Sequence, residues 1–242
     1  MKIGKHIKTD IGSSDLKQWD RIIKPIMSDM MDIGMKVAKL RSATLVIPSK
    51  KDTFRAFELT QPENLKVILV GQDPYPKYGQ PTGVAFGVDI EKSVTVPFSL
   101  KMILEEVENT TGILQLDPDH TLEPWCRQGV LMLNTAFTLE AGRIGSHTEL
   151  WRPFTERLLR DITKEYPEVP VIFLGSQAAA FEKCLNGNPV IKASHPAAEA
   201  YGRRGGFLKS GVFSKCNRVL EEQGKEPIDW NLHEGLQSNI DP

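Results

Sequence analysis

Short runs of uninterrupted apolar residues form the clearest pattern along the 242-residue chain, and each is followed at once by glycine or polar residues. The runs occupy residues 66–70, 130–133, 170–174 and, less clearly, 189–192. Strands that are apolar on both faces are typical of a parallel sheet covered by helices on both sides. The pattern therefore predicts a central, mostly parallel sheet of four strands.

Helical periodicity fills the intervals between these runs. Apolar residues recur at i, i+3, i+4 and i+7 from Leu100 to Val107, directly after Ser99, a suitable N-cap residue. Pro153 marks the expected start of a second helix, whose stripe repeats every four residues from Phe154. Alternating strands and helices predict an α/β fold in the form of a three-layer α/β/α sandwich.

Length and composition fit one globular domain over residues 1–242, with 40% hydrophobic and 25% charged residues. We expect residues 1–60 to form a helical lead-in and residues 231–242 a polar tail. No apolar run approaches the roughly 20 residues that cross a bilayer, and the N-terminus lacks the pattern of a signal peptide. We therefore expect an intracellular protein, cytoplasmic or nuclear, without membrane contact.

The net charge of −1 argues against a protein that coats nucleic acid, although residues 200–220 carry five cationic and no acidic side chains. Such a patch fits a few phosphate contacts.

The three cysteines, Cys126, Cys184 and Cys216, are odd in number and show no paired metal-ligand spacing. We expect free buried thiols, no metal and no other cofactor. The chain also lacks a P-loop, a G-x-S-x-G and a strand-linked G-x-G-x-x-G, which argues against an ordinary hydrolase or nucleotide-binding protein.

Polar residues follow every apolar run, and in parallel sheets ligands bind beyond the carboxyl ends of the strands. These residues are Gly71-Gln72-Asp73-Pro74-Tyr75-Pro76, then Asn134, then Gly175-Ser176, and finally Ser194-His195-Pro196. We expect them to converge on one site.

Each of these polar clusters has an ordinary structural interpretation beside a functional one. Prolines and a glycine make a stiff loop around Asp73, which suits a catalytic carboxylate or a structural turn. Asn134 can read the edge of a planar base or simply end a strand. Ser99 and Ser176, near expected helix starts, can contact phosphates or act as caps. Taken singly, none of these signals decides the function.

Taken together, in order and spacing, the motifs resemble family 1 of the uracil-DNA glycosylases. The similar segments are VILVGQDPYPKYGQPTGVAF (67–86), VLMLNT (130–135), GSHTELW (145–151), VIFLGS (171–176), SHP (194–196) and FSKCNRVLEEQGKEPIDW (213–230). The likeness runs over roughly residues 64–230, most of the chain. It implies an enzyme that flips uracil out of single- or double-stranded DNA and hydrolyses its N-glycosidic bond without a cofactor.

The resemblance also implies roles for individual residues. Asp73 is expected to orient the attacking water and stabilise the positive charge that grows on the sugar. His195 is expected to donate to uracil O2 as a neutral imidazole, assisted by the backbone N–H near Gln72. Asn134 is expected to accept from uracil N3–H and donate to O4, a pattern that cytosine does not offer.

Further contacts follow from the same resemblance. Tyr75 is expected against uracil C5, where thymine carries a methyl group, and Phe86 is expected to stack on the base. Ser99 and Ser176 are expected to hold flanking phosphates while the nucleotide is extruded. His147 is expected to support the site from behind.

The chain departs from the usual family pattern in two places, and at both it resembles the poxviral branch. Pro76 stands where the family commonly has His, and Ala197, Ala198 and Glu199 follow His195-Pro196 in place of Ser-Pro-Leu, whose Leu fills the vacated base stack. A carboxylate there would be repelled by phosphates, so we expect Tyr201 or Arg203 to take the wedge position and contact DNA.

Two other functions fit the same fold. One is a DNA-binding or polymerase-tethering module with weak or no glycosylase activity, and the other is a glycosylase for a different lesion. We expect a monomer that acts on uracil-containing DNA and has a proteinaceous inhibitor or a replication protein as a possible partner.

Overall fold

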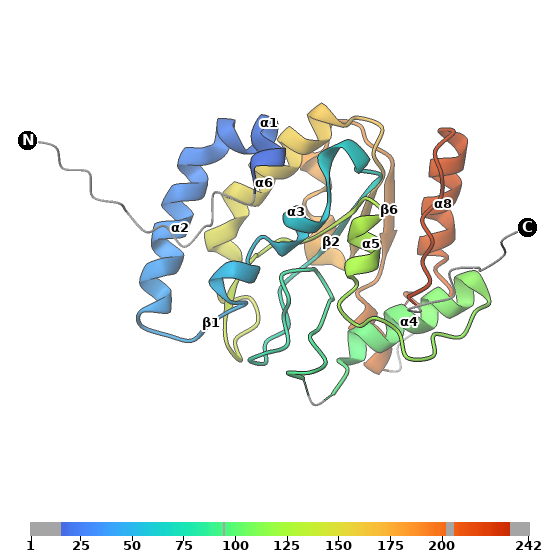
Figure 1. Ribbon diagram of the computed structural model, residues 1–242, viewed down its shortest axis with the longest axis horizontal. Helices are drawn as coiled ribbons and strands as arrows, with labels where there is room; N and C mark the ends of the chain where they lie inside the picture. Colours follow the sequence, from blue (N-terminus) through green and yellow to red (C-terminus); the bar gives the residue numbers. More distant parts are fainter. Residues whose placement is uncertain (1–15, 94, 202–205, 233–242) are drawn as a thin grey trace, which may run out of the picture.

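Four parallel strands form the centre of the computed structural model, which describes residues 16–93, 95–201 and 206–232 (Figure 1). The strands are β2 (Val67–Gly71), β3 (Val130–Asn134), β5 (Val171–Leu174) and β6 (Val190–Ala193), in the spatial order β3-β2-β5-β6. All three strand pairs are parallel. The predicted four-stranded sheet is confirmed, and each strand begins and ends within one residue of the apolar run that predicted it.

Helices and short 3-10 segments connect the strands. The α-helices are α1 (Asp20–Ile23), α2 (Met27–Arg41), α3 (Arg55–Leu59), α4 (Phe98–Thr111), α5 (Glu123–Arg127), α6 (Thr148–Glu165), α7 (Ser176–Ala179) and α8 (Val212–Glu222). The 3-10 segments are η1 (Lys17–Trp19), η2 (Lys24–Ile26), η3 (Lys50–Asp52), η4 (Pro62–Asn64), η5 (Glu182–Cys184) and η6 (Pro196–Tyr201). A separate antiparallel pair, β1 (Val46–Ile47) with β4 (Leu139–Glu140), was not predicted, because two residues are too few to give a pattern.

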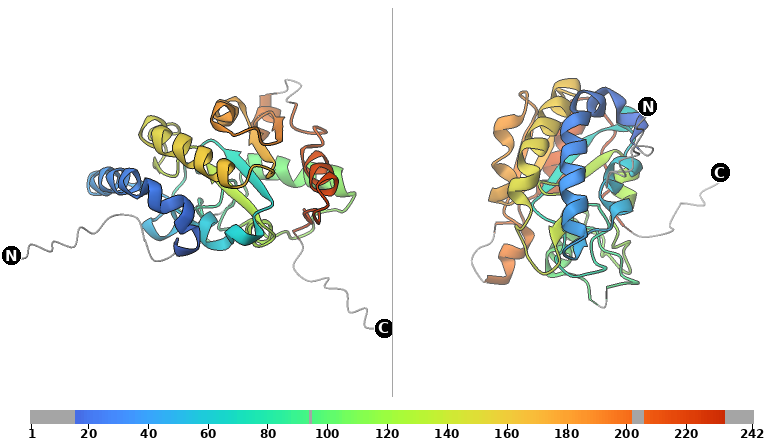
Figure 2. Two further views of the ribbon diagram at one scale, coloured as in Figure 1. Left: turned by 90° about the horizontal axis from the view of Figure 1, so that it is seen from above. Right: turned by 90° about the vertical axis from the view of Figure 1, so that its left-hand side faces the viewer.

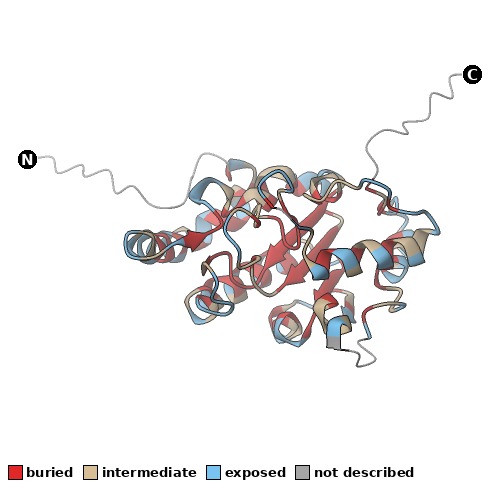
Figure 3. Ribbon diagram, turned by 90° about the horizontal axis from the view of Figure 1, so that it is seen from below, coloured by how far each residue is buried: buried red, intermediate tan, exposed pale blue. Residues whose placement is uncertain are grey.

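Side chains alternate across the sheet and supply two separate cores. On β2, Ile68 and Val70 pack with α1, α2, α3 and α6, whereas Val67 and Leu69 pack with α4, α5 and α8. The helices lie on both sides of the strands (Figure 2), and the strands form the buried centre (Figure 3). The three-layer α/β/α sandwich is therefore confirmed. No helix among the described residues is long and apolar enough to cross a membrane.

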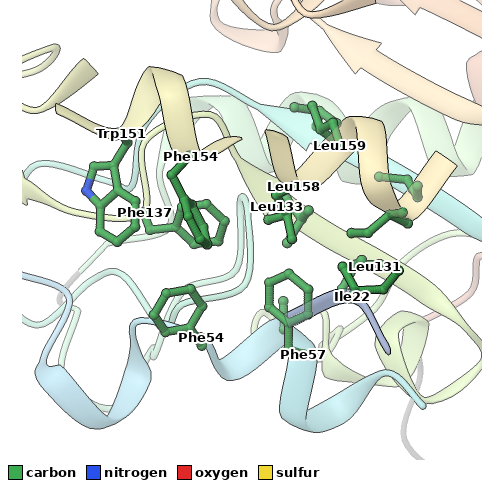
Figure 4. Close-up of a cluster of buried hydrophobic side chains, with 14 of the residues drawn as sticks. Ile22, Phe54, Phe57, Leu131, Leu133, Phe137, Trp151, Phe154, Leu158 and Leu159 are labelled. Atoms are coloured by element: carbon green, nitrogen blue, oxygen red, sulfur yellow. The ribbon is translucent and has the colours of Figure 1, made fainter. Parts of the chain in front are cut away.

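Aromatic side chains fill the first core, under α6 (Figure 4). The ring of Phe137 lies 5.0 Å from that of Trp151 and 5.2 Å from that of Phe54. Trp19, from the N-terminal helices, packs edge-on against Phe57 at 5.3 Å, and its indole N–H donates to the Phe57 carbonyl at 3.0 Å. The described helices of the lead-in therefore form one layer of the sandwich together with α6.

The second core is closed by the C-terminal segment. Trp230 packs against Trp125 with ring centroids 5.1 Å apart, and Trp125 Nε1 donates to the Trp230 carbonyl at 3.1 Å. Leu232 is only 1% exposed, and its N–H donates to Gln115 Oε1 at 3.0 Å. The expected polar tail from residue 231 is thus wrong for its first residues, because a single leucine in a polar segment finds a buried position there. Residues 233–242 lie outside the described part.

Two expected helix starts were wrong. Pro97 is the N-cap of α4, and Ser99 lies inside the first turn, because the helix begins at Phe98. Helix α6 begins at Thr148 and contains Pro153, which forfeits only one backbone hydrogen bond near the start of an 18-residue helix. The stripe from Phe154 runs to the end of α6, where Tyr166 is the C-cap and packs against the core.

Candidate active site

The four polar clusters meet at the carboxyl edge of the sheet. Strand β2 lies between β3 and β5: the chain passes from β2 to β3 on one side and then from β3 to β5 on the other, and ligands bind at such a reversal in open α/β sheets. Gly71, the last residue of β2, pairs in register with Asn134, the last residue of β3. Beyond Gly71, the Gln72 carbonyl accepts the Ala136 N–H at 3.0 Å and the Thr135 hydroxyl at 2.9 Å. These bonds fix the loop that carries Asp73.

The Asp73 carboxylate is held by one oxygen and open at the other. Its Oδ2 accepts from Gln72 Nε2 and from the Gly145 N–H, each at 3.1 Å. Its Oδ1 is buried and has no hydrogen-bond partner in the described part of the chain. Burial raises the pKa of Asp73, although the bonds from Gly145 and Gln72 oppose the rise. The result is a fixed carboxylate with one oxygen available to a bound molecule.

Gly71 allows Asn134 and Phe86 to approach the end of β2. A Cβ at this position would lie 2.9 Å from Asn134 Oδ1 and 2.9 Å from Phe86 Cε2. Phe86 has a positive φ of 64°, an uncommon conformation for an aromatic residue, and it is 8% exposed. Asn134 is equally well buried, and its side-chain amide has no hydrogen bond within the described residues. An apolar ring and an open amide therefore share one small space.

His195 borders the same space. Its ring lies 5.8 Å from that of Phe86, centroid to centroid. The Ala197 N–H donates to His195 Nδ1 at 3.1 Å, so the ring proton belongs on Nε2. Burial lowers the pKa of His195, which favours the neutral ring. Gly175 makes room for it, because a Cβ there would lie 3.0 Å from that of His195 and φ is +98°.

Tyr75 and Ser99 form a buried pair. The Tyr75 hydroxyl is buried without a well-formed hydrogen bond in the described structure, and burial raises the pKa of the phenol. The Ser99 hydroxyl and the Leu100 N–H beside it oppose that rise in part. Ser99 is 9% exposed, whereas Ser176 is exposed at the first position of α7. Of the two serines expected on phosphates, Ser176 is the more accessible.

The segment after His195 departs from the usual family pattern, and the structure shows what Glu199 does instead. Its Oε1 accepts the N–H groups of Phe207 and Leu208 at 2.9 and 3.0 Å. Glu199 therefore holds the neighbouring loop and is turned away from a wedge role. Arg203 lies outside the described residues, as does the side chain of Tyr201, so their expected DNA contacts stay predictions.

His147 is buried and bonded to the chain that follows β3, and its expected supporting role stays a prediction. Its Nδ1 is 2.9 Å from the hydroxyl of Thr138, which also accepts the Trp151 indole N–H at 2.8 Å. Burial lowers the pKa of His147. The bonds tie the start of α6 to the chain that follows β3.

Sequence reasoning missed the hydrogen bonds that Gly145 and Glu106 make to distant segments. Gly145 donates to Asp73 across 72 positions of sequence, and Glu106 accepts from the N–H groups of Lys209 and Gly211 at 2.6 and 2.8 Å. A glutamate on the apolar face of an expected helix, one position before Val107, was the available signal for Glu106. Nothing local marks Gly145 beyond its being a glycine in a quoted motif. Among the described residues, no group of three or more His, Cys, Asp or Glu side chains could hold a metal ion.

Comparison with known proteins decides the family. Residues 57–221 match the model of the uracil DNA glycosylase superfamily. The chain belongs to this superfamily. Uracil-DNA glycosylase 1 of Listeria monocytogenes is 36% identical over 230 residues, covering 90% of this chain and 99% of that protein. The uracil-DNA glycosylase of Corynebacterium efficiens is 34% identical over 217 residues, covering 88% of this chain and 89% of that one.

Solved structures of the superfamily share the fold. The crystal structure of mimivirus uracil-DNA glycosylase has a TM-score of 0.79 and 24% identity, over 92% of this chain and 88% of that chain. A variant of mimivirus UNG in complex with UGI has a TM-score of 0.79 and 25% identity, over 89% and 88% of the two chains. The family resemblance drawn from the motifs is thereby confirmed.

Proposed function

We propose that this superfamily member is a monofunctional uracil-DNA glycosylase that flips uracil out of DNA and hydrolyses its N-glycosidic bond, leaving an abasic site. One observation carries the proposal. Asp73 Oδ1, the Asn134 amide and His195 Nε2 belong to residues at the carboxyl ends of β2, β3 and β6, and none of them has a hydrogen-bond partner among the described residues. A tethering module would have no use for these three groups left open together, so that alternative is not favoured.

The bond to the base breaks as positive charge grows on the sugar and negative charge on the uracil. Asp73 Oδ1 faces the positive charge and orients the attacking water, while Oδ2 stays anchored by Gly145. The neutral ring of His195 carries its proton on Nε2, in the place required for a hydrogen bond to uracil O2. His195 donates this hydrogen bond without transferring the proton. The backbone N–H near Gln72 assists at the same oxygen.

Base selection rests on three side chains. The Asn134 amide accepts from N3–H and donates to O4, so cytosine would leave buried polar groups unpaired. Phe86 stacks on the base. The ring of the base then lies between the end of β2 and His195, whose ring is near that of Phe86. Tyr75 fills the space beside C5 and leaves no room for a methyl group.

DNA is held outside the crevice. Ser176, exposed at the start of α7, contacts a phosphate flanking the flipped nucleotide, and Ser99 supports Tyr75 in addition to its expected phosphate contact. Two crystal structures of mimivirus UNG variants are complexes with UGI. By that likeness we propose a protein inhibitor of the same kind as a partner, and a monomer acting in the cytoplasm or nucleus, where its DNA substrate lies.

The test is base release from a labelled oligonucleotide that carries one uracil, in excess EDTA, with matched cytosine and thymine strands. Abasic sites in the uracil strand alone would support the enzyme class, the lack of a metal requirement and the specificity together. DNA binding without base release would contradict the proposal and favour the tethering module.

A further inference from the structure

An exposed apolar side chain stands beside the catalytic carboxylate. Ile144 is 68% exposed, and it directly precedes Gly145, whose N–H donates to Asp73 Oδ2. Exposed isoleucine at a loop tip has no packing role in the free protein. Its position one residue before the N–H that bonds to Asp73 places it near this carboxylate.

The loop that carries Ile144 is held rigidly. The Gly142 N–H donates to the Pro76 carbonyl at 2.8 Å, which joins this loop to the Asp73 loop a second time. Glu140 and Arg143 bond each other through backbone and side chains, at 2.9 and 2.6 Å. A side chain on such a loop keeps its position when another molecule presses on it.

The usual source of an apolar wedge is unavailable here. Glu199 occupies the wedge position of the family pattern, and its carboxylate is bonded to the backbone of Phe207 and Leu208. The neighbouring Ala197 and Ala198 have side chains of a single methyl group. Proteins that distort DNA commonly insert Ile, Leu, Phe or Met between base steps.

We propose that Ile144 is the apolar wedge that enters the base stack of duplex DNA beside the flipped nucleotide. This inference rests on the proposed glycosylase function and names a further positioning residue for it. Ile144 fills the space that uracil vacates and thereby slows its return. Because the 141–146 loop is bonded to Asp73 and Pro76, insertion of the wedge and seating of the carboxylate occur in one fixed geometry.

The test compares duplex with single-stranded substrate. A wedge matters where a base must be unpaired and unstacked, and it matters little for a base that is already unpaired. We expect Ile144→Ala to lower kcat/KM on a duplex U·A substrate by about tenfold and on single-stranded DNA by about twofold or less. A U·G duplex should fall between the two, and Ile144→Leu should retain most of the duplex activity.

Matched variants keep the assignment specific. Leu116→Ala removes a side chain of similar exposure, 70%, from the segment between α4 and α5, and it should change neither rate. Phe98→Ala removes another exposed apolar side chain, beside Ser99, and should also leave both rates unchanged. Ile144→Ala should keep the wild-type melting temperature, since its side chain packs little in the free protein.

A second readout follows the stack directly. With Asp73→Asn to prevent cleavage, 2-aminopurine placed next to uracil should brighten on binding, and adding Ile144→Ala should remove most of that rise. If Ile144→Ala lowered kcat/KM equally on duplex and single-stranded DNA, the wedge assignment would be overturned. It would also be overturned if Phe98→Ala or Tyr201→Ala, and not Ile144→Ala, lowered kcat/KM selectively on the duplex. Failure of the wild-type chain to release uracil from single-stranded DNA would instead overturn the proposed function.

Discussion

The burial of Asp73, which suits its carboxylate to the proposed reaction, also destabilises the folded chain. Oδ1 is buried without a partner among the described residues, and burial raises the pKa of the carboxyl group. Removing the charge should therefore stabilise the fold while it removes the stabilisation of the growing sugar charge. Activity and stability are expected to change in opposite directions.

We predict that Asp73→Asn lowers kcat about a thousandfold, the scale of losing one electrostatic contact to a transition state, while DNA affinity survives. The same variant should unfold with a free energy about 1 kcal/mol higher at neutral pH, because no buried carboxylate remains. Uracil release, DNA binding and urea unfolding measure the three effects. Undiminished release of uracil would contradict the role given to Asp73.

The pH dependence of that stability difference has a definite sign. A carboxyl group whose pKa is raised in the folded state destabilises the fold only when it is ionised. The advantage of Asp73→Asn should therefore be present at neutral pH and vanish as the pH falls through the raised pKa, to nothing near about pH 3. In the wild type, activity should fall over the same acid range, because the protonated carboxyl no longer supports the sugar charge.

Tyr75 gives a second prediction at the scale of one residue. If its buried ring excludes the methyl group of thymine, Tyr75→Ala should begin to release thymine, while uracil release falls about tenfold from lost packing. Thymine release from a T·A duplex, with Tyr75→Phe as the matched control, measures this. Absence of thymine release from Tyr75→Ala, in a folded protein, would count against the steric gate.

At the scale of elements, the end of β2 is built around the missing side chain of Gly71. A Cβ at this position would lie 2.9 Å from both Asn134 Oδ1 and Phe86 Cε2. The strand itself could accept alanine, since the clash involves only the two side chains that are proposed to bind the base. Gly71 therefore serves the site rather than the sheet.

We predict that Gly71→Ala lowers kcat/KM for uracil release by about a hundredfold, because both base-binding side chains must move, and that it costs about 1–3 kcal/mol of stability from overpacking. Steady-state rates and thermal unfolding check this. Gly187→Ala is the control, since a Cβ there meets nothing within 4 Å and φ is +87°. That variant should lose stability through backbone strain and keep its activity, so equal activities of the two variants would refute the prediction.

At the scale of the whole molecule, the charge balance limits how the chain binds DNA. The net charge is −1, with 30 Lys and Arg against 31 Asp and Glu, so the surface carries no overall positive field. Contact with DNA must come from a few local groups around the crevice. Such binding depends only moderately on salt.

We predict that raising salt from about 50 to 200 mM weakens DNA binding about 40-fold, as for about three phosphate contacts. Fluorescence anisotropy with a labelled duplex in the Asp73→Asn background measures the slope. Binding of free uracil, which has no phosphate, is the control and should stay constant. A loss of about a thousandfold or more would show a larger basic footprint than this charge balance suggests.

The sequence by itself determined the strands and the order of the site motifs. Apolar runs such as residues 130–133 have no polar face to expose, so a doubly covered parallel sheet is the arrangement that buries them. The turn residues that follow each run then necessarily meet at one edge. This is why the region of the site could be predicted before any contact between its residues was known.

Only the tertiary structure decided how the side chains are employed. The open oxygen of Asp73 depends on a bond to Gly145, 72 residues away, and the proton position of His195 depends on how the chain turns at Ala197. In the sequence, Glu199 stands at the wedge position but is unsuited to that role. In the structure, its carboxylate accepts hydrogen bonds from the N–H groups of Phe207 and Leu208. Local composition carries no record of such contacts, because the partners are brought together only when the layers pack.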